Sequence, residues 1–190
     1  MIIFGYQGIG KSTLANSLEG AQFIDLESSM FRTPMHPERS EDWFQAYGNI
    51  AYHLSHESNK VVLCSCHDKI RDYIYEEKET KNEHIAICYP SLDLKDAWLE
   101  RLTKRYELTH ELKDKAALNF AVASYTSSIK ALEKDTNFDH IVICDINYSL
   151  LEAIKSYHAR YKHLDCDHFH STGLDTCKII LRSEKCNDSN

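Results

Sequence analysis

Eight consecutive residues near the start of the chain have the types and spacing that hold a phosphate chain. They run from Gly5 to Ser12 as GYQGIGKS and match the pattern G-x-x-x-x-G-K-[S/T] at every defined position. Glycines let such a loop wrap around phosphates with its N–H groups inward, the lysine reaches the β- and γ-phosphates, and the hydroxyl binds Mg²⁺. The alternative is a glycine-rich turn with a chance Lys-Ser. The predicted nucleotide contacts are Gly5, Gln7, Gly8, Ile9, Gly10, Lys11, Ser12 and Thr13.

Two carboxylates, Asp25 and Glu27, follow the next apolar run of the chain. Residues i and i+2 of a strand point to the same side, so both acids are expected at one edge of a sheet. Mg²⁺ takes one or two carboxylates beside phosphate oxygens, which makes Asp25 the predicted partner of Ser12 in the metal site. We expect Glu27 to orient or deprotonate an acceptor hydroxyl, with Ser28 as a further substrate contact. The alternative is that these acids only end the strand.

Three arginines are candidates for binding anionic groups. Arg71 opens a helical segment after the third apolar run, where it could clamp an anionic substrate or simply be a solvated helix residue. Arg101 and Arg105 lie four residues apart on one helix face, a spacing suited to neutralising a phosphoryl group in transfer. Surface pairing with neighbouring glutamates is the alternative for this pair. The next segment, 106–115, is predicted to form a small lid.

Cysteines and histidines raise the question of a metal site. Cys64, Cys66 and His67 are too close along an extended strand to converge on one ion, because adjacent side chains point to opposite faces. A second group has metal-capable residues but matches no zinc spacing pattern, so its metal binding stays open. This group contains Cys166, His168, His170, Cys177 and Cys186.

The elements that must position these residues follow an alternating pattern. Short apolar runs without polar alternation are typical of strands buried on both faces, and helical spacing separates them, as at 43–54 and 150–161. Strands and helices in alternation predict an α/β fold with a parallel sheet. The predicted strands are Ile2–Phe4, Gln22–Leu26, Val61–Cys66, Ile85–Tyr89 and Ile141–Cys144.

The length, net charge and apolar content of the chain limit the classes of protein to which it can belong. The 190 residues have average globular composition and a formal net charge of −7, which argues against a general nucleic-acid binder. No apolar run reaches the roughly 20 residues of a bilayer span, and the glycine loop starts too early to leave room for a signal peptide, so a cytoplasmic location is expected. We predict one domain over residues 1–162, and a tail or small appendage over residues 163–190. A homodimer is one option for the oligomeric state.

The phosphate loop and the acidic pair resemble those of P-loop kinases in the nucleoside-monophosphate-kinase-like branch, which includes adenylate, shikimate and gluconate kinases. In shikimate and gluconate kinases a similar acidic pair follows the second strand, and its first acid serves the magnesium site while its second meets the acceptor. Cys64-Ser65 with Arg71-Asp72 is similar to the third-strand region of gluconate kinase. Arg101 and Arg105 lie where the family has its lid arginines.

The resemblance implies a three-layer α/β/α sandwich with a five-stranded parallel sheet of order 2-3-1-4-5 and a short lid. It also implies an ATP- and Mg²⁺-dependent kinase whose small-molecule acceptor is a nucleoside or nucleoside monophosphate. The adenylate-kinase stretch Asp-Gly-Phe-Pro-Arg and the shikimate-binding glycine triplet are absent, which leaves the acceptor open. A sugar-acid or polyol kinase like gluconate kinase, and a regulatory ATPase without an acceptor, are the alternatives.

Overall fold

Strands and helices alternate along the described part of the chain. The computed structural model describes residues 1–32, 39–57, 60–77, 84–162 and 176–182. The strands are β1 (Ile2–Gly5), β2 (Phe23–Leu26), β3 (Val61–Ser65), β4 (Ile85–Pro90), β5 (Asp139–Ile143) and β6 (Cys177–Ile180). The α-helices are α1 (Lys11–Ala15), α2 (Trp43–Glu57), α3 (Asp68–Glu77), α4 (Lys95–Thr109), α5 (Leu112–Lys134) and α6 (Leu150–Lys162). The predicted α/β class is confirmed, and each predicted apolar run overlaps a strand.

The strands form one mixed, mostly parallel sheet in the order β2-β3-β1-β4-β5-β6. β3 pairs in parallel with both β1 and β2, whereas β6 pairs antiparallel with β5. The prediction of five parallel strands therefore missed one strand, β6, which comes from the segment expected to be a tail or appendage. β6 has only four residues, none of them fully buried, and Lys178 interrupts its apolar pattern.

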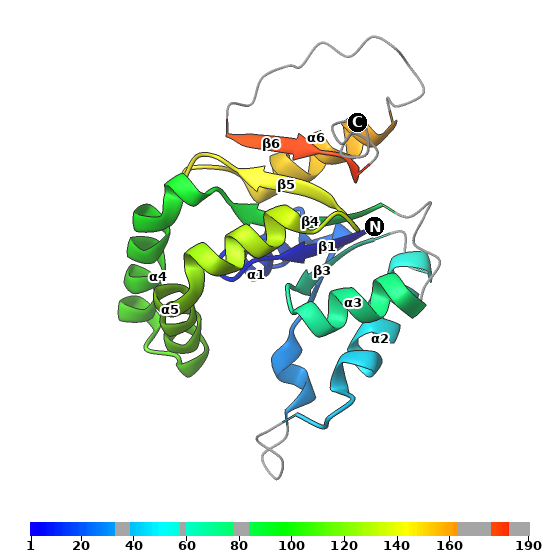
Figure 1. Ribbon diagram of the computed structural model, residues 1–190, viewed down its shortest axis with the longest axis horizontal. Coiled ribbons are helices and arrows are strands. Elements are labelled where there is room, and N and C mark those ends of the chain that lie inside the picture. Colours follow the sequence, from blue (N-terminus) through cyan, green and yellow to red (C-terminus); the bar gives the residue numbers. More distant parts are fainter. Residues whose placement is uncertain (33–38, 58–59, 78–83, 163–175, 183–190) are drawn as a thin grey trace. The chain divides into compact units, whose positions relative to one another are not determined.

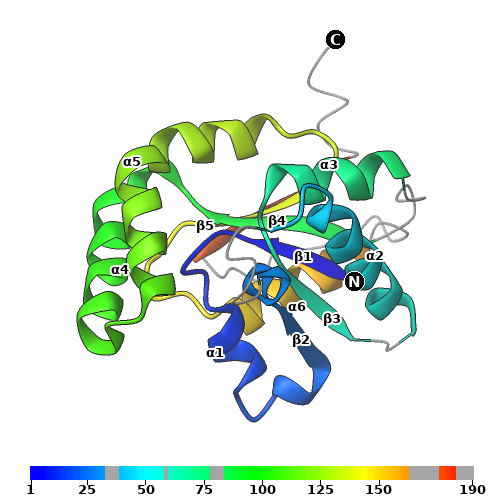
Figure 2. The ribbon, with the colours of Figure 1, turned by 90° about the horizontal axis from the view of Figure 1, so that it is seen from below.

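The chain divides into two compact units. The first contains Met1–Tyr6 and Gly10–Ile87, and the second contains Gln7–Ile9 and Cys88–Asn190. In the first unit β1, β3 and β2 run side by side, and α2 packs against β3 and α3 (Figure 2). Tyr47 of α2 is fully buried there, as the helical spacing of 43–54 predicted.

In the second unit, α4 and α5 lie side by side as a helical hairpin, and α6 packs against β5 and β6 (Figure 1). The hairpin turns at His110, which has a left-handed φ of 52°, so the segment 106–115 predicted to be a lid forms the end of α4, the turn and the start of α5. α5 has 23 residues and was not predicted as a helix. Within the described ranges, no helix is both long and apolar enough to cross a bilayer.

Candidate functional site

The loop between β1 and α1 contains two glycines with left-handed backbone angles. Gly8 and Gly10 have φ angles of 79° and 95°, in the left-handed region that residues with a Cβ rarely adopt. A Cβ built on Gly10 would meet nothing within 4 Å, so a glycine is needed there for its backbone angles and not for lack of space. The sequence pattern that predicted the loop therefore coincides with a local main-chain shape that two of its glycines make accessible.

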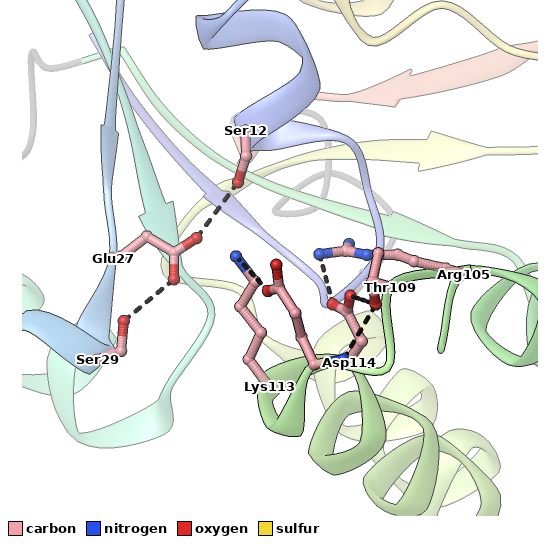
Figure 3. A network of polar contacts seen from close by, with 8 residues as sticks. Ser12, Glu27, Ser29, Arg105, Thr109, Lys113 and Asp114 are labelled. Atoms are coloured by element: carbon pink, nitrogen blue, oxygen red, sulfur yellow. Dashed lines mark hydrogen bonds and ion pairs between the residues drawn. The ribbon is translucent and has the colours of Figure 1, made fainter. Parts of the chain in front are cut away.

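Lys11 and Ser12, at the start of α1, have polar partners within the first unit. The Lys11 ammonium donates to the carbonyl oxygen of Gly5 over 3.1 Å, which folds the side chain back toward the end of β1. The Ser12 hydroxyl donates to Oε1 of Glu27 over 3.2 Å (Figure 3). Thr13, the last predicted nucleotide contact, is exposed.

Glu27 is the carboxylate that the structure brings to Ser12. Its second oxygen, Oε2, accepts from the Ser29 hydroxyl over 3.2 Å (Figure 3). Asp25, the predicted metal partner of Ser12, lies within β2 opposite Leu63 of β3 and is half-buried. Glu27 is the first residue beyond β2, where the chain leaves the sheet edge and its longer side chain reaches α1. The pair of hydroxyl and carboxylate suited to Mg²⁺ is thus Ser12 and Glu27.

The helix after the loop is short. α1 has five residues, because the chain turns back so closely that a Cβ on Gly20 would lie 2.0 Å from the carbonyl oxygen of Ala15. A single helical turn carries little of the macrodipole that a long helix directs at an anion. The loop N–H groups and the Lys11 ammonium are therefore the main sources of positive potential at this site.

A cluster of polar and aromatic side chains surrounds Ser28, the residue after Glu27. Arg39 donates from Nε to the Ser28 carbonyl over 3.0 Å and from Nη2 to the Ser28 hydroxyl over 2.8 Å. The guanidinium also lies 4.2 Å from the ring centroid of Trp43, within range of a cation–π interaction. Sequence reasoning missed Arg39, because it lies before the first turn of α2 and belongs to no motif.

His67 completes this cluster, which we call the Ser28 cluster: Ser28, Arg39, Trp43 and His67. Its Nε2 lies 3.2 Å from the Ser28 hydroxyl, and its ring meets Trp43 edge-on at 5.3 Å. Although the residue as a whole is exposed, desolvation of the ring and the nearby Arg39 charge lower the pKa of His67 to about 4. The imidazole is therefore neutral near pH 7, and its Nε2 can accept the proton of Ser28.

Tyr47 forms hydrogen bonds with the ends of both β2 and β3, next to Ser28. Its hydroxyl donates to the carbonyl oxygen of Leu26 and accepts from the main-chain N–H of Ser65 over 2.8 Å. The Ser65 hydroxyl in turn accepts from the main-chain N–H of Ser28 over 3.4 Å. A fully buried tyrosine thereby sets the spacing between the end of β2, from which Glu27 and Ser28 emerge, and the end of β3, which leads to His67.

Arg71, a predicted substrate contact, has its partners at the junction of β3 and α3. It is 6% exposed, and its guanidinium donates to the carbonyl oxygen of Cys66 and pairs with Asp68 at 3.2 Å. The structure thus places it among local structural contacts, and this placement gives no support to a substrate role.

The middle of the phosphate loop, Gln7–Ile9, belongs to the second unit, where aromatic side chains contact it. The indole Nε1 of Trp98 donates to the Gln7 carbonyl oxygen over 3.1 Å, and the Tyr148 hydroxyl donates to the Ile9 carbonyl oxygen over 2.6 Å. A Cβ on Gly8 would lie 2.7 Å from a methyl group of Leu102, so a larger residue there would require the Leu102 side chain of α4 to shift. Trp98 and Tyr148 had been assigned no role from the sequence.

The two predicted phosphate-binding arginines of α4 have different surroundings. Arg101 lies 5.4 Å from the ring centroid of Trp98 and 5.1 Å from that of Tyr148, and donates to the Ile146 carbonyl oxygen over 3.4 Å. Arg105 forms an ion pair of 2.6 Å with Asp114 of α5 (Figure 3). Only Arg101 contacts the aromatic residues that hold the loop, so the structure does not present the two arginines as one anion clamp.

The C-terminal cysteine and histidine group falls mostly outside the described residues. Cys166, His168, His170 and Cys186 lie there, and Cys177 begins β6 as a free thiol. Among the residues that the structure does describe, no three histidine, cysteine, aspartate or glutamate side chains gather as a metal site.

No protein-family model matches the chain, and no curated protein matches it.

Proposed function

We propose that the protein is an ATP- and Mg²⁺-dependent kinase that phosphorylates a small acceptor, with a nucleoside monophosphate favoured over a nucleoside. The proposal includes a P-loop NTPase fold, a three-layer α/β/α sandwich whose first five strands have the order 2-3-1-4-5. The observation that carries it is the hydrogen bond from Ser12 to Glu27, directly beside a loop with the phosphate-binding pattern. A hydroxyl and a carboxylate next to a phosphate chain are the ligands that Mg²⁺ prefers.

In this proposal Lys11 and the loop N–H groups bind the β- and γ-phosphates, and Ser12 and Glu27 hold Mg²⁺ with Asp25 as a second carboxylate. The metal, when bound, neutralises charge that develops on the transferring phosphoryl group. Arg101 is the side chain proposed to bind the same phosphoryl group through its positive charge. The ion pair of Arg105 with Asp114 supports a structural role for Arg105.

The position of Glu27 bears on the acceptor. A carboxylate that binds the metal is not available to deprotonate an acceptor hydroxyl. A phosphate acceptor is already ionised near pH 7 and needs no general base. The adjacent Ser28 cluster contributes the Arg39 cation and the indole ring of Trp43. A guanidinium with five N–H donors, of which Ser28 takes two, suits a phosphate group, and an aromatic face suits a base. These features support a nucleoside monophosphate.

An acceptor screen with γ-labelled ATP tests the proposal. The purified chain is incubated with Mg²⁺, labelled ATP and separate pools of nucleoside monophosphates, nucleosides and sugar acids, and the labelled product is identified. We expect label in a nucleoside monophosphate, and none with the Lys11→Ala variant. Label in a sugar acid would identify the polyol-kinase alternative, and slow release of phosphate that no pool stimulates would identify the regulatory ATPase. Failure of the folded chain to bind any purine triphosphate would refute nucleotide binding itself.

A further inference from the structure

Two carbonyl groups of the loop between β1 and α1, those of Gln7 and Ile9, accept hydrogen bonds from aromatic side chains. Trp98 Nε1 donates to the carbonyl oxygen of Gln7 over 3.1 Å, and the Tyr148 hydroxyl donates to that of Ile9 over 2.6 Å. Both donors are buried, with Trp98 0% and Tyr148 9% exposed, and both belong to the same compact unit as Gln7–Ile9. These contacts are long-range in sequence, since α4 and the segment before α6 supply them.

Because the peptide bond is planar, these two contacts also fix the directions of the N–H groups of Gly8 and Gly10. In a planar trans peptide, the carbonyl of one residue and the N–H of the next point in opposite directions. Holding the Gln7 carbonyl toward Trp98 therefore directs the N–H of Gly8 away from Trp98. Holding the Ile9 carbonyl toward Tyr148 likewise directs the N–H of Gly10 away from Tyr148. The two N–H groups are those of the glycines with left-handed φ angles, the arrangement that builds an anion-binding concavity.

The two aromatic side chains are themselves held in place. Their rings stack with an interplanar angle of 16° and centroids 6.1 Å apart. The Arg101 guanidinium lies over both rings and donates to the Ile146 carbonyl oxygen, two residues before Tyr148. Leu102, one residue beyond Arg101, approaches Gly8 from the same helix. The donors are thus part of a packed assembly, and a change in either one leaves the other contacts present.

We propose that Trp98 and Tyr148 are positioning residues for phosphate binding, which preset the N–H groups of Gly8 and Gly10 to face the phosphate chain. The inference rests on the proposed nucleotide-binding function, and it assigns its ligand to the polyphosphate part of the nucleotide. Presetting the peptides in advance spares the bound state the cost of orienting them, so the two donors strengthen binding without touching the ligand.

The test uses Tyr148→Phe, which removes one hydroxyl and keeps the ring under Arg101. The matched control is Tyr125→Phe, because the buried Tyr125 hydroxyl donates over 2.8 Å to the Ser91 carbonyl, away from the loop. Affinity for inorganic tripolyphosphate and for ATP is measured by calorimetry on the full chain, together with the melting temperature. We expect roughly threefold to tenfold weaker binding of both ligands by Tyr148→Phe, the equivalent of one hydrogen bond. Tyr125→Phe should lose comparable stability and no affinity.

A spectroscopic measurement separates positioning from general destabilisation. In ¹⁵N-labelled protein, the amide signals of Gly8 and Gly10 should shift on addition of tripolyphosphate, and the Gly10 shift should shrink in Tyr148→Phe. Trp98→Phe should reduce the Gly8 shift in the same way. If the wild-type chain binds ATP and tripolyphosphate but all variants bind equally well, the positioning role is wrong while the proposed function stands. Equal weakening by Tyr125→Phe would also overturn it. If the wild-type chain binds neither ligand, the proposed function fails as well.

Discussion

At the scale of single residues, Glu27 has the clearest chemical surroundings, because its two oxygens face the hydroxyls of Ser12 and Ser29. Glu27→Gln should lower the phosphoryl-transfer rate by about 100-fold or more, since a neutral amide cannot help hold a divalent cation at the developing charge. ATP binding without Mg²⁺ should change little. Rate and affinity are measured by labelled-ATP transfer and by calorimetry with and without a chelator. Glu19→Gln, at an exposed position that contacts Ser17, is the matched control and should retain full activity.

Arg39 is the second residue with a specific expectation. If it binds an anionic acceptor beside Ser28, Arg39→Gln should raise the KM for the acceptor by about tenfold and leave the KM for ATP unchanged, because a charge-assisted hydrogen bond is lost on one substrate alone. Steady-state kinetics with each substrate varied in turn give both constants. The same substitution at the exposed Arg32 controls for net charge. An equal rise in both KM values would place Arg39 outside the acceptor site.

His67 makes stability depend on pH in a defined direction. Its pKa is lowered to about 4 in the folded chain, below the ordinary value of 6.5, so between these values the unfolded chain binds more protons. The free energy of unfolding should therefore fall as the pH drops from about 6.5 to about 4. We expect a loss of about 1 kcal/mol after solvent screening at this exposed position. Urea denaturation across this range should show a shallower pH slope for His67→Gln than for the wild-type chain.

At the scale of elements, the junction of α4 and α5 depends on a buried carboxylate. Asp114 is 2% exposed, accepts from the Thr109 hydroxyl over 2.6 Å and pairs with Arg105, whose side chain is 41% exposed. Removing either partner should have unequal effects. Arg105→Gln leaves a charge buried and should cost about 2 kcal/mol of unfolding free energy, whereas Asp114→Asn leaves a solvated arginine and should cost about 1 kcal/mol.

Chemical denaturation of the two variants measures this asymmetry. Lys113→Gln is the control in the same segment, because Lys113 and Glu111 form an ion pair whose side chains are 55% and 51% exposed. Such a pair should contribute less than about 0.5 kcal/mol. If Asp114→Asn proved more costly than Arg105→Gln, the carboxylate would be contributing through Thr109 and not through the ion pair.

At the scale of the whole molecule, the sequence predicted what local patterns encode. The approximate strand positions and the buried residues Tyr47 and Ala51 of α2 follow from residue spacing alone. Contacts between distant segments were missed, because Trp98 and Tyr148 meet the loop only after the chain folds. The role of Asp25 was assigned from strand periodicity, which places both acids on one side but does not say which of them reaches α1.

Two elements were missed for different physical reasons. α5 buries side chains such as Ala121, Tyr125 and Ile129 at helical spacing, but many polar residues between them weaken the pattern. β6 is a short strand that depends on its pairing with β5. Its four residues, interrupted by Lys178, are too few to distinguish it from a loop.

The pairing of β6 predicts the outcome of shortening the chain. A chain that ends at residue 162, the domain boundary suggested by composition, loses β6 and exposes the ladder edge of β5, from His140 to Ile143. It also loses the main-chain N–H of Arg182 that donates to the buried Asp139 over 2.7 Å. We expect this chain to self-associate in light scattering and size-exclusion chromatography. A chain that ends at Arg182 retains β6 and should stay monodisperse.

β6 therefore covers the hydrogen-bonding edge of β5. Without it, unpaired donors and acceptors along a strongly apolar strand would act as a template on which a second copy could add its own strand. Turbidity that grows with protein concentration, while the remaining helices keep their circular-dichroism signal, would be the sign of such templating. The segment that looks most dispensable in the sequence is thus expected to limit association between neighbouring molecules.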